Sequence, residues 1–336
     1  MTVTIRNLAE KLNLSITTVS RALDGYHDVA EETRQRVIEA AHEMGYVPSY
    51  AARQLRRKRS DAIGYILPTS SPRFSDPFYV SFLTGLCDEV ASRQLDLSVT
   101  SCPPDSDIEQ TLYRRWVQSR RVDGVVLNRV RLHDWRIQFL AQSHVPFVAL
   151  GKSDIPVDFP YIEVDDQSAV QDLVAHLVGA GHRQIAFIGA SPELVIHANR
   201  FNGYQSGLEA AGIPYDSNLY IEGDLSEASG YQAAAVLLNR QPRPTAILGI
   251  NDLTALGVVQ AAKERGIDIG TDLAIAGYDG IKETEYTNPP LTTVYQPTYE
   301  IARNLAQMLI RLIEGDTLEE SHISIKAQLM IRPSTG

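Results

Sequence analysis

The sequence predicts an α/β protein in which an all-α headpiece precedes two lobes, each built on a doubly wound parallel sheet. The first sixty residues show only helical spacing of apolar side chains, whereas after Asp61 short apolar runs alternate with amphipathic helix patterns. That alternation is typical of parallel sheets covered by helices on both faces. It occurs twice in series, and 336 residues suffice for a small module and two larger domains.

Two short helices are expected at the start of the chain. The first has an apolar face formed by Ile5, Leu8, Ala9 and Leu12. Ser15 is placed to cap a second helix, Ile16–Leu23. Such a pair forms a helix-turn-helix, whose second helix can enter a DNA major groove, although an ordinary pair of amphipathic helices would show the same spacing. On the second helix we expect outward-facing hydrogen-bond donors at Thr17, Thr18, Ser20 and Arg21.

A third helix is expected from Glu31 to Met44, with Gly45 as its stop. Its N-cap position holds Ala30, which costs about 1 kcal/mol of local stability relative to a capping side chain. Asp28 could partly substitute as the cap.

Charge is distributed unevenly along the chain. Residues 1–60 hold ten Lys and Arg against seven Asp and Glu, a balance of +3, so a whole-chain charge of −10 leaves −13 on residues 61–336. The run Arg56-Arg57-Lys58-Arg59 would repel itself on a free surface, and a phosphate backbone would neutralise it. We therefore expect any DNA contact to be confined to the first sixty residues.

The expected elements of the body form two series and a tail. The first series has strands at 62–67, 95–99, 122–127 and 146–150, with helices at 78–91, 108–118 and 134–141. The second starts near Tyr161 and has strands at 184–188, 219–222, 246–250 and 273–278, with helices at 167–178, 199–211, 227–238 and 253–265. The tail adds a helix at 298–313 and a last strand pair at 322–325 and 328–331.

Several classes of protein are disfavoured by what the sequence lacks. The two cysteines, Cys87 and Cys102, have neither disulfide-framework density nor zinc-ligand spacing, and Cys87 is expected to be buried on a helix face. No signal-peptide core or membrane span is evident, which predicts a cytoplasmic protein with no membrane partner. No phosphate-binding loop, nucleophile elbow or metal-ligand spacing occurs, so we expect no enzyme, no cofactor and no metal.

The N-terminal residues resemble the DNA-binding headpiece and hinge of the lactose-repressor (LacI/GalR) family. The resemblance rests on Ala9, Thr18-Val19-Ser20-Arg21-Ala22-Leu23, Thr33-Arg34, Val37, Gly45-Tyr46-Val47-Pro48 and Ala52-Arg53-Gln54-Leu55. It implies a sequence-specific transcriptional regulator, most often a repressor, whose body is like a type I periplasmic sugar-binding protein. Three crossovers between the lobes are implied, near Tyr161, Thr292-Thr293 and Ser321. The expected domains are a headpiece at 1–47, a hinge at 48–60, an N-terminal lobe at 61–161 plus 293–320, and a C-terminal lobe at 162–292 plus 321–336.

The resemblance also assigns the DNA contacts. The second helix would lie in the major groove, with bases read by Thr17, Thr18 and Arg21, and phosphates contacted by Thr4, Ser15, Ser20 and Tyr46. Ile16 belongs to the same helix. The hinge would fold on specific DNA and insert Leu55 into a minor-groove step. Its other expected contacts are Tyr50, Ala52, Arg53 and Arg56.

Polar residues at strand ends are the candidates for binding a small effector between the lobes. Asn251 and Asp252 open a helix after a strand and match the family's effector motif, although Asp252 could simply be an N-cap. Asp279 ends a strand, and Arg200 matches an arginine that reaches the ligand from a helix start, with a surface salt bridge as the alternative. Phe78 and Tyr79 occupy the family's position for a flat apolar contact, or they belong to the core. Weaker candidates are Asp76, Asn128 and Lys152, and Leu225 is a tenth candidate because it stands where the family places an effector contact.

Departures from the family pattern bear on the effector. Purine-responsive members carry an arginine and an aromatic residue where this chain has Leu194 and Leu225, so we favour a mono- or disaccharide over a purine or nucleoside. The tail lacks leucine heptads, which predicts a homodimer on a pseudo-palindromic operator. The alternative class is a sugar-binding receptor without DNA function.

Overall fold

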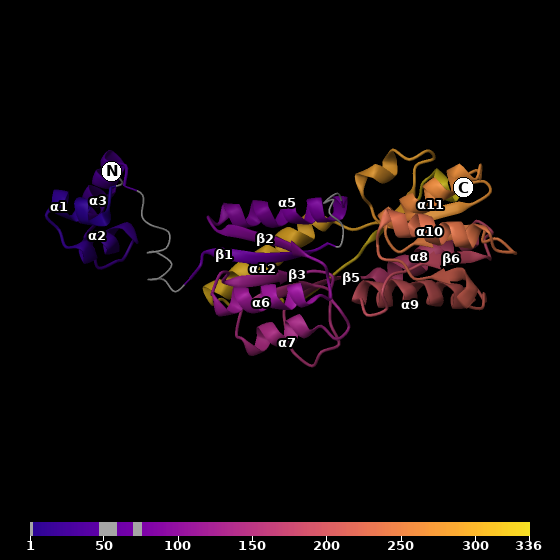
Figure 1. The fold of residues 1–336 in the computed structure, drawn as a ribbon, viewed down its shortest axis with the longest axis horizontal. Coiled ribbons are helices and arrows are strands. Elements are labelled where there is room, and N and C mark those ends of the chain that lie inside the picture. The colour runs from indigo at the N-terminus through magenta and orange to yellow at the C-terminus, as the bar shows by residue number, and fades with distance from the viewer. Residues whose placement is uncertain (1–2, 47–58, 70–75) are drawn as a thin grey trace. The chain divides into compact units, whose positions relative to one another are not determined.

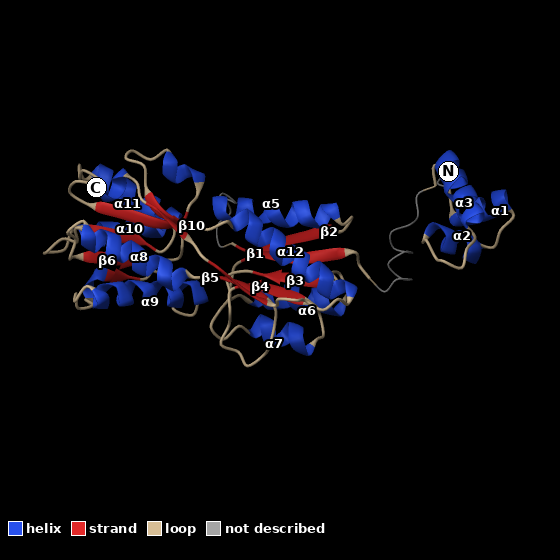
Figure 2. Ribbon diagram, turned by 180° about the vertical axis from the view of Figure 1, so that it is seen from behind, coloured by secondary structure: helices blue, strands red, loops and turns tan. Residues whose placement is uncertain are grey.

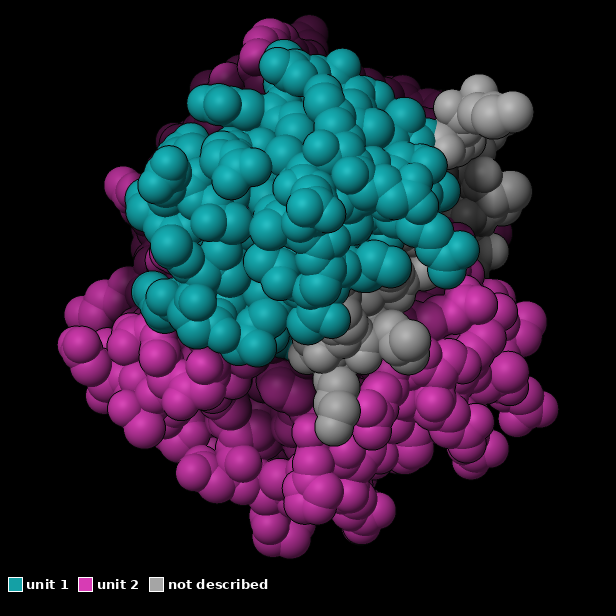
Figure 3. All heavy atoms as spheres, turned by 90° about the vertical axis from the view of Figure 1, so that its left-hand side faces the viewer, with its two compact units in different colours: residues 1–60 teal, residues 61–336 magenta. Residues whose placement is uncertain are grey.

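The computed structural model describes residues 3–46, 59–69 and 76–336. Internal contacts divide the chain into two compact units, residues 1–60 and 61–336 (Figure 3). Each unit has its own hydrophobic core.

The first unit contains three helices, α1 (Ile5–Leu12), α2 (Ile16–Leu23) and α3 (Glu31–Met44), as the sequence predicts (Figure 1). Thr4 caps α1 in a capping box with Asn7, and the Ser15 hydroxyl caps α2 by accepting from the Thr18 amide at 3.0 Å. Ala30 gives α3 no side-chain cap, and Asp28 pairs with Arg21 instead of capping. The buried core consists of Leu8, Ala9, Val19, Ala22, Val29, Val37, Ala40 and Ala41.

The second unit contains two six-stranded sheets with helices on both faces of each (Figure 2). The first sheet has the order β11-β5-β4-β3-β1-β2, and all its pairings are parallel. Its strands are β1 (Ala62–Pro68), β2 (Asp96–Cys102), β3 (Gly124–Leu127), β4 (Phe147–Leu150), β5 (Tyr161–Val164) and β11 (His322–Ile325). One face is covered by α5 (Pro77–Ser92) and α12 (Thr298–Glu314), and the other by α6 (Asp107–Gln118) and α7 (Trp135–Gln142). We call this sheet and its helices the first lobe.

The second lobe is built on the sheet of order β12-β10-β9-β8-β6-β7. Its strands are β6 (Ile185–Ile188), β7 (Tyr220–Ile221), β8 (Ala246–Gly249), β9 (Ala274–Asp279), β10 (Thr292–Tyr295) and the antiparallel edge strand β12 (Gln328–Met330). One face packs against α8 (Asp166–Gly179) and α9 (Val195–Ala210), the other against α10 (Glu227–Leu238) and α11 (Asp252–Glu264). The doubly wound architecture agrees with the predicted fold class.

The chain crosses between the lobes three times, each time a few residues later than the sequence analysis expected. β5 pairs with β4 and β11, so it completes the first sheet, and β10 pairs with β9 in the second. The last two strands, expected as a pair, lie in different sheets, β11 beside β5 and β12 beside β10. The reason is that a strand's sheet is decided by its pairing partners, which chain spacing does not reveal.

A short backbone bridge adds a non-covalent connection between the lobes. The Leu132 amide donates to the Glu193 carbonyl at 2.8 Å, and the Val195 amide donates to the Val130 carbonyl at 3.0 Å. Leu194, the N-cap residue of α9, supplies no side-chain cap. A carbonyl of the first lobe therefore accepts from the first amide of a helix in the second lobe. We call this pair of hydrogen bonds the interlobe clasp.

Three further observations bear on the sequence analysis. Helix α9 begins at Val195 rather than Asn199, because the clasp satisfies its first amide. Cys87 was expected to be buried and is exposed, since it lies on the solvent side of α5 beside the buried Leu86. Among the described residues, no helix has the length and apolarity needed to cross a membrane.

Candidate functional site

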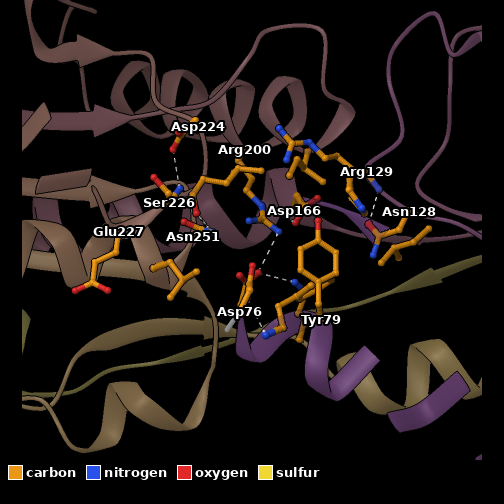
Figure 4. Close-up of a pocket in the computed structure, with 18 of the residues that line it drawn as sticks. Asp76, Tyr79, Asn128, Arg129, Asp166, Arg200, Asp224, Ser226, Glu227 and Asn251 are labelled. Carbon is orange, nitrogen blue, oxygen red and sulfur yellow. Dashed lines mark hydrogen bonds and ion pairs between the residues drawn. The ribbon is translucent and has the colours of Figure 1, made fainter. Parts of the chain in front are cut away.

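A cavity of about 960 Å³ lies where the carboxyl ends of strands from both sheets meet (Figure 4). This volume is at the upper end of the roughly 300–1,000 Å³ that small-molecule sites span. Eight of the ten predicted effector residues line it, namely Asp76, Phe78, Tyr79, Asn128, Arg200, Leu225, Asn251 and Asp279. The strand-end positions and the family resemblance together therefore located the cavity from sequence.

Arg200 is the centre of a buried charge network. Its Nε contacts Asp166 Oδ1 at 3.1 Å, its Nη1 donates to the Ile250 carbonyl at 2.7 Å, and its Nη2 lies 3.7 Å from Asp279 Oδ1. The guanidinium carbon also lies 3.6 Å from the centre of the Tyr278 ring. Burial lowers the pKa of Arg200, but the two carboxylates outweigh it and raise that pKa above its ordinary value. Arg200 is thus neither at a helix start nor in a surface salt bridge, because it lies inside α9 and is only 3% exposed.

Asp279 joins this network from the end of β9. Its Oδ1 accepts from Gln296 Nε2 at 2.7 Å. Burial raises the pKa of Asp279 well above its ordinary value, against the opposing charge of Arg200, and Asp252 and Asp76 raise it further. Asp279 therefore combines a hydrogen bond within the second lobe with a place in the lining of the cavity.

Asp76 and two aromatic residues form the wall contributed by α5. Asp76 caps the helix by accepting from the Phe78 amide at 2.9 Å. Burial raises the pKa of Asp76 to about 6, the Phe78 amide lowers it, and the charge of Glu283 raises it. Phe78 stacks on the buried Phe82 and meets Tyr79 edge-on, so both rings line the cavity while they pack against the core.

Three residues of the cavity lining have a left-handed backbone conformation. Arg129, Leu225 and Asp279 line it with φ values of 51°, 74° and 116°. Positive φ is uncommon outside glycine, costs energy, and tends to occur at ligand sites where the surrounding structure enforces it. The backbone amide of Arg129 donates to the side-chain oxygen of the preceding residue, Asn128.

Two predicted effector residues do not line the cavity. Asp252 is fully buried, and its carboxylate accepts from the Ile281 amide at 2.9 Å and the Thr293 hydroxyl at 2.6 Å. It joins α11 to the segments around β9 and β10, while Asn251 caps α11 and faces the cavity. Burial raises the pKa of Asp252 to about 7. Lys152 is exposed on the loop after β4, where only Leu150 and Gly151 reach the lining.

Sequence reasoning missed several polar residues of the lining, including Asp166, Arg129, Gln296 and Asp224. Each follows a strand by one to three residues, after β5, β3, β10 and β7 respectively. The rule that found Asn251 would have found them if it had been applied to every strand.

On the first unit, α2 exposes part of its predicted DNA-contact set. Ile16 is 44% exposed, and Thr17 and Arg21 are exposed, while Thr18 is half-buried. Ser20 was expected to face outward, but it is only 7% exposed and its hydroxyl donates to Asp24. The reason is that Ser20 lies at the edge of the face on which Val19 and Leu23 pack.

The remaining predicted DNA contacts have mixed outcomes. Tyr46 packs against the headpiece core. Thr4 caps α1 and Ser15 caps α2, and both residues are exposed. Arg21 pairs with Asp28 and lies 5.1 Å from the Tyr26 ring centre. Five predicted hinge contacts lie outside the described residues: Tyr50, Ala52, Arg53, Leu55 and Arg56.

Both parts of the chain match families of known proteins. Residues 4–49 match the model "Bacterial regulatory proteins, lacI family", and residues 174–335 match a periplasmic binding protein-like domain. The chain is 34% identical to the HTH-type transcriptional regulator AglR of Rhizobium meliloti, over 100% of this chain and 95% of that protein. It is 32% identical to the HTH-type transcriptional regulator CelR of Thermobifida fusca, over 94% of each.

Solved structures agree with these matches over the whole length. A lac repressor dimer bound to operator and the anti-inducer ONPF superposes with a TM-score of 0.84 at 28% identity, covering 100% of this chain and 99% of the other. A CelR–cellobiose complex has a TM-score of 0.75 at 30% identity, covering 99% of each chain. The chain therefore belongs to the lacI family of bacterial regulatory proteins, and it is a DNA-binding transcription regulator rather than an enzyme.

Proposed function

We propose that the protein is a repressor that binds a pseudo-palindromic operator as a homodimer, and that a mono- or disaccharide in the cavity controls its operator affinity. The observation that carries this proposal is the lining of the cavity. Carboxyl groups, amides and aromatic rings from both lobes face one space. A ligand that touches both lobes stabilises one relative arrangement of them, which is the requirement for a switch.

The chemistry of the lining favours a polyhydroxylated ligand. The side chains of Asp76, Asn251 and Asp279 accept hydrogen bonds from hydroxyl groups, and the Phe78 and Tyr79 rings offer flat apolar surfaces for the C–H face of a sugar ring. The similar CelR structure is a cellobiose complex. A purine is less well supported at the two positions where purine-responsive members carry an arginine and an aromatic residue. Leu225 lines the cavity and Leu194 is buried beside the interlobe clasp, so neither residue supplies a stacking ring or a guanidinium.

The DNA contacts follow from the exposed face of α2 and from the hinge. Thr17, Thr18 and Arg21 would read base edges in the major groove. Thr4, Ser15 and Tyr46 would contact phosphates, whereas the buried Ser20 is no longer among the proposed contacts. Tyr50, Ala52, Arg53, Leu55 and Arg56 would complete the interface once the hinge folds on specific DNA, with Leu55 inserted between base steps.

Fluorescence anisotropy with labelled DNA from upstream of the protein's own gene tests the DNA part. We expect much tighter binding than to a random duplex, and a steep fall in affinity with salt as the basic residues release counterions. Leu55→Ala should weaken operator binding much more than non-specific binding, because a base-step wedge acts only at the specific site. Equal binding to both duplexes would refute sequence-specific recognition, and sedimentation velocity showing a monomer would refute the dimer.

A further inference from the structure

We infer that the effector is an uncharged oligosaccharide of two or more rings, and that the cavity discriminates against phosphorylated and carboxylated sugars. This inference rests on the sugar effector proposed above and adds its charge and size. It follows from the distribution of charge around the cavity, from the occupation of Arg200 and of the helix ends, and from the extent of the lining.

The lining is rich in acidic groups. Among its described residues two arginines, Arg129 and Arg200, face six carboxyl groups, those of Asp76, Glu163, Asp166, Asp224, Glu227 and Asp279. Residues 70–75 are outside this comparison. A phosphate or carboxylate would therefore enter a site with an excess of like charge, which costs free energy in a partly desolvated space.

Arg200, the arginine at the centre of the network, has little capacity left for an anion. Every guanidinium nitrogen of Arg200 faces a protein oxygen, from Asp166, Ile250 or Asp279. Arg129 is less fully engaged: its charge acts on the Tyr79 hydroxyl and on Asp224, and its buried Nε has no hydrogen-bond partner among the described residues. A bidentate phosphate contact at Arg200 would first have to break this arrangement, and a single Arg129 faces the six carboxyl groups.

Helix N-termini, the other usual anion sites, are also occupied. Four helices begin at the cavity with an acidic residue at the cap or in the first turn: Asp76 for α5, Asp166 for α8, Glu227 for α10 and Asp252 for α11. Carboxylates at these positions neutralise the helix dipole that would attract a phosphate. The N-terminus of α9 carries no acid, but its first amide already donates to the Val130 carbonyl in the interlobe clasp.

The size of the ligand follows from the extent of the lining. Aromatic side chains line the cavity from both lobes, Phe78 and Tyr79 from α5 and Tyr231 from α10. Gln232 and Gln260 extend the lining along α10 and α11 beyond the Arg200 network. With a volume near the upper end of small-molecule sites, the cavity suits a chain of sugar rings better than one ring.

A ligand panel on the full-length protein tests charge and size together. The probes are glucose, glucose 6-phosphate, trehalose, trehalose 6-phosphate, maltose, cellobiose, maltotriose and adenosine. Thermal shift identifies binders, because a ligand that binds only the folded state raises the melting temperature, and calorimetry then gives affinities. We expect at least one neutral oligosaccharide to bind about tenfold or more tightly than glucose and than either phosphorylated sugar.

The other outcomes are distinguishable. Tighter binding of a phosphorylated sugar would overturn the inference about charge, and tighter binding of glucose would overturn the inference about size. Either result would still agree with a sugar-responsive regulator. Binding of adenosine alone, or of no probe, would overturn this inference together with the proposed sugar effector.

A double variant at two exposed acidic positions tests the role of charge directly. Asp224→Asn with Glu227→Gln keeps side-chain size and the hydrogen bond that Asp224 accepts from the Ser226 amide, while removing two negative charges. We expect the ratio of neutral to phosphorylated sugar affinity to fall at least threefold in this variant. Glu319→Gln, at an exposed acid outside the lining, should leave the ratio unchanged. An unchanged ratio in a folded double variant would overturn charge selection.

Discussion

Arg200 shows how the structure changes the meaning of a residue that the sequence identified. Its guanidinium balances Asp166 and Asp279, so its removal leaves two buried carboxylates unpaired. We expect Arg200→Met to lower the free energy of unfolding by about 3–5 kcal/mol, the usual cost of breaking a buried ion pair. Denaturant unfolding of the variant measures this loss, with the exposed Arg115→Met as a matched control. A loss no larger than the control's would show that the network is not structural.

Asp76 provides a prediction about pH. Its pKa of about 6 in the folded protein lies above the ordinary value of 3.8, so between these values the folded state binds more protons than the unfolded state. The stability that protonated Asp76 supplies is therefore lost as pH rises through about 6. Asp76→Asn removes this titration and keeps a good N-cap.

The melting temperature of the Asp76→Asn variant, relative to the parent, should accordingly be higher at about pH 7.5 than at about pH 5. The expected difference is about 1–2 kcal/mol in stability after allowance for solvent screening. Because the charge of Asp76 also raises the pKa of Asp279, the comparison measures Asp76 together with this coupling. The same offset at both pH values would contradict the raised pKa.

Arg21 provides a prediction about DNA. Its pair with Asp28 is about half exposed on each side, and such pairs contribute little to stability. A proposed base contact from Arg21 requires that this pair opens. We expect Asp28→Asn to strengthen operator binding by about two- to tenfold, because it frees Arg21 and removes a charge that repels phosphate.

Anisotropy titrations measure this effect, and Glu39→Gln on α3 serves as the control for a general loss of negative charge. An equal gain in both variants would show that Asp28 does not act through Arg21.

At the scale of elements, the interlobe clasp has a sharp test. Proline at position 195 would sit at the first position of α9, where its fixed φ suits the helix, and the extended Leu194 before it is compatible with proline. Val195→Pro would therefore remove the amide that donates to Val130 without breaking the helix. We expect effector affinity to fall by about two- to tenfold relative to Val195→Ala, the value of one hydrogen bond. Equal affinities in the two variants would mean that the clasp does not support ligand binding.

Elements were predictable where a local pattern determines them. The bounds of α2 and α3 and the strand-end position of Asn251 follow from caps, apolar spacing and glycine stops. The turn of Asp252 away from the cavity depends on partners in distant segments, Ile281 and Thr293, and the burial of Ser20 depends on how α2 packs in the headpiece core. Single-sequence patterns carry no information on such partners, so these two predictions were wrong.

At the scale of the whole molecule, the alternation of strands and helices predicted two lobes, and the charge difference between residues 1–60 and the body separated the two units. The family resemblance supplied the three crossovers. Their positions required strand pairing, which placed β5 and β11 in the first sheet and β10 in the second. Domain order can thus be read from local periodicity, whereas the lobe to which a strand belongs cannot.

The central claim is that a sugar bound in the cavity controls DNA binding by the headpiece. The most direct measurement is an operator titration of the full-length protein by anisotropy, with and without the neutral oligosaccharide that binds it most tightly. A coupling of about 1–3 kcal/mol predicts a change in operator affinity of about 5- to 150-fold. An operator affinity that stays the same when the sugar saturates the cavity would contradict the claim.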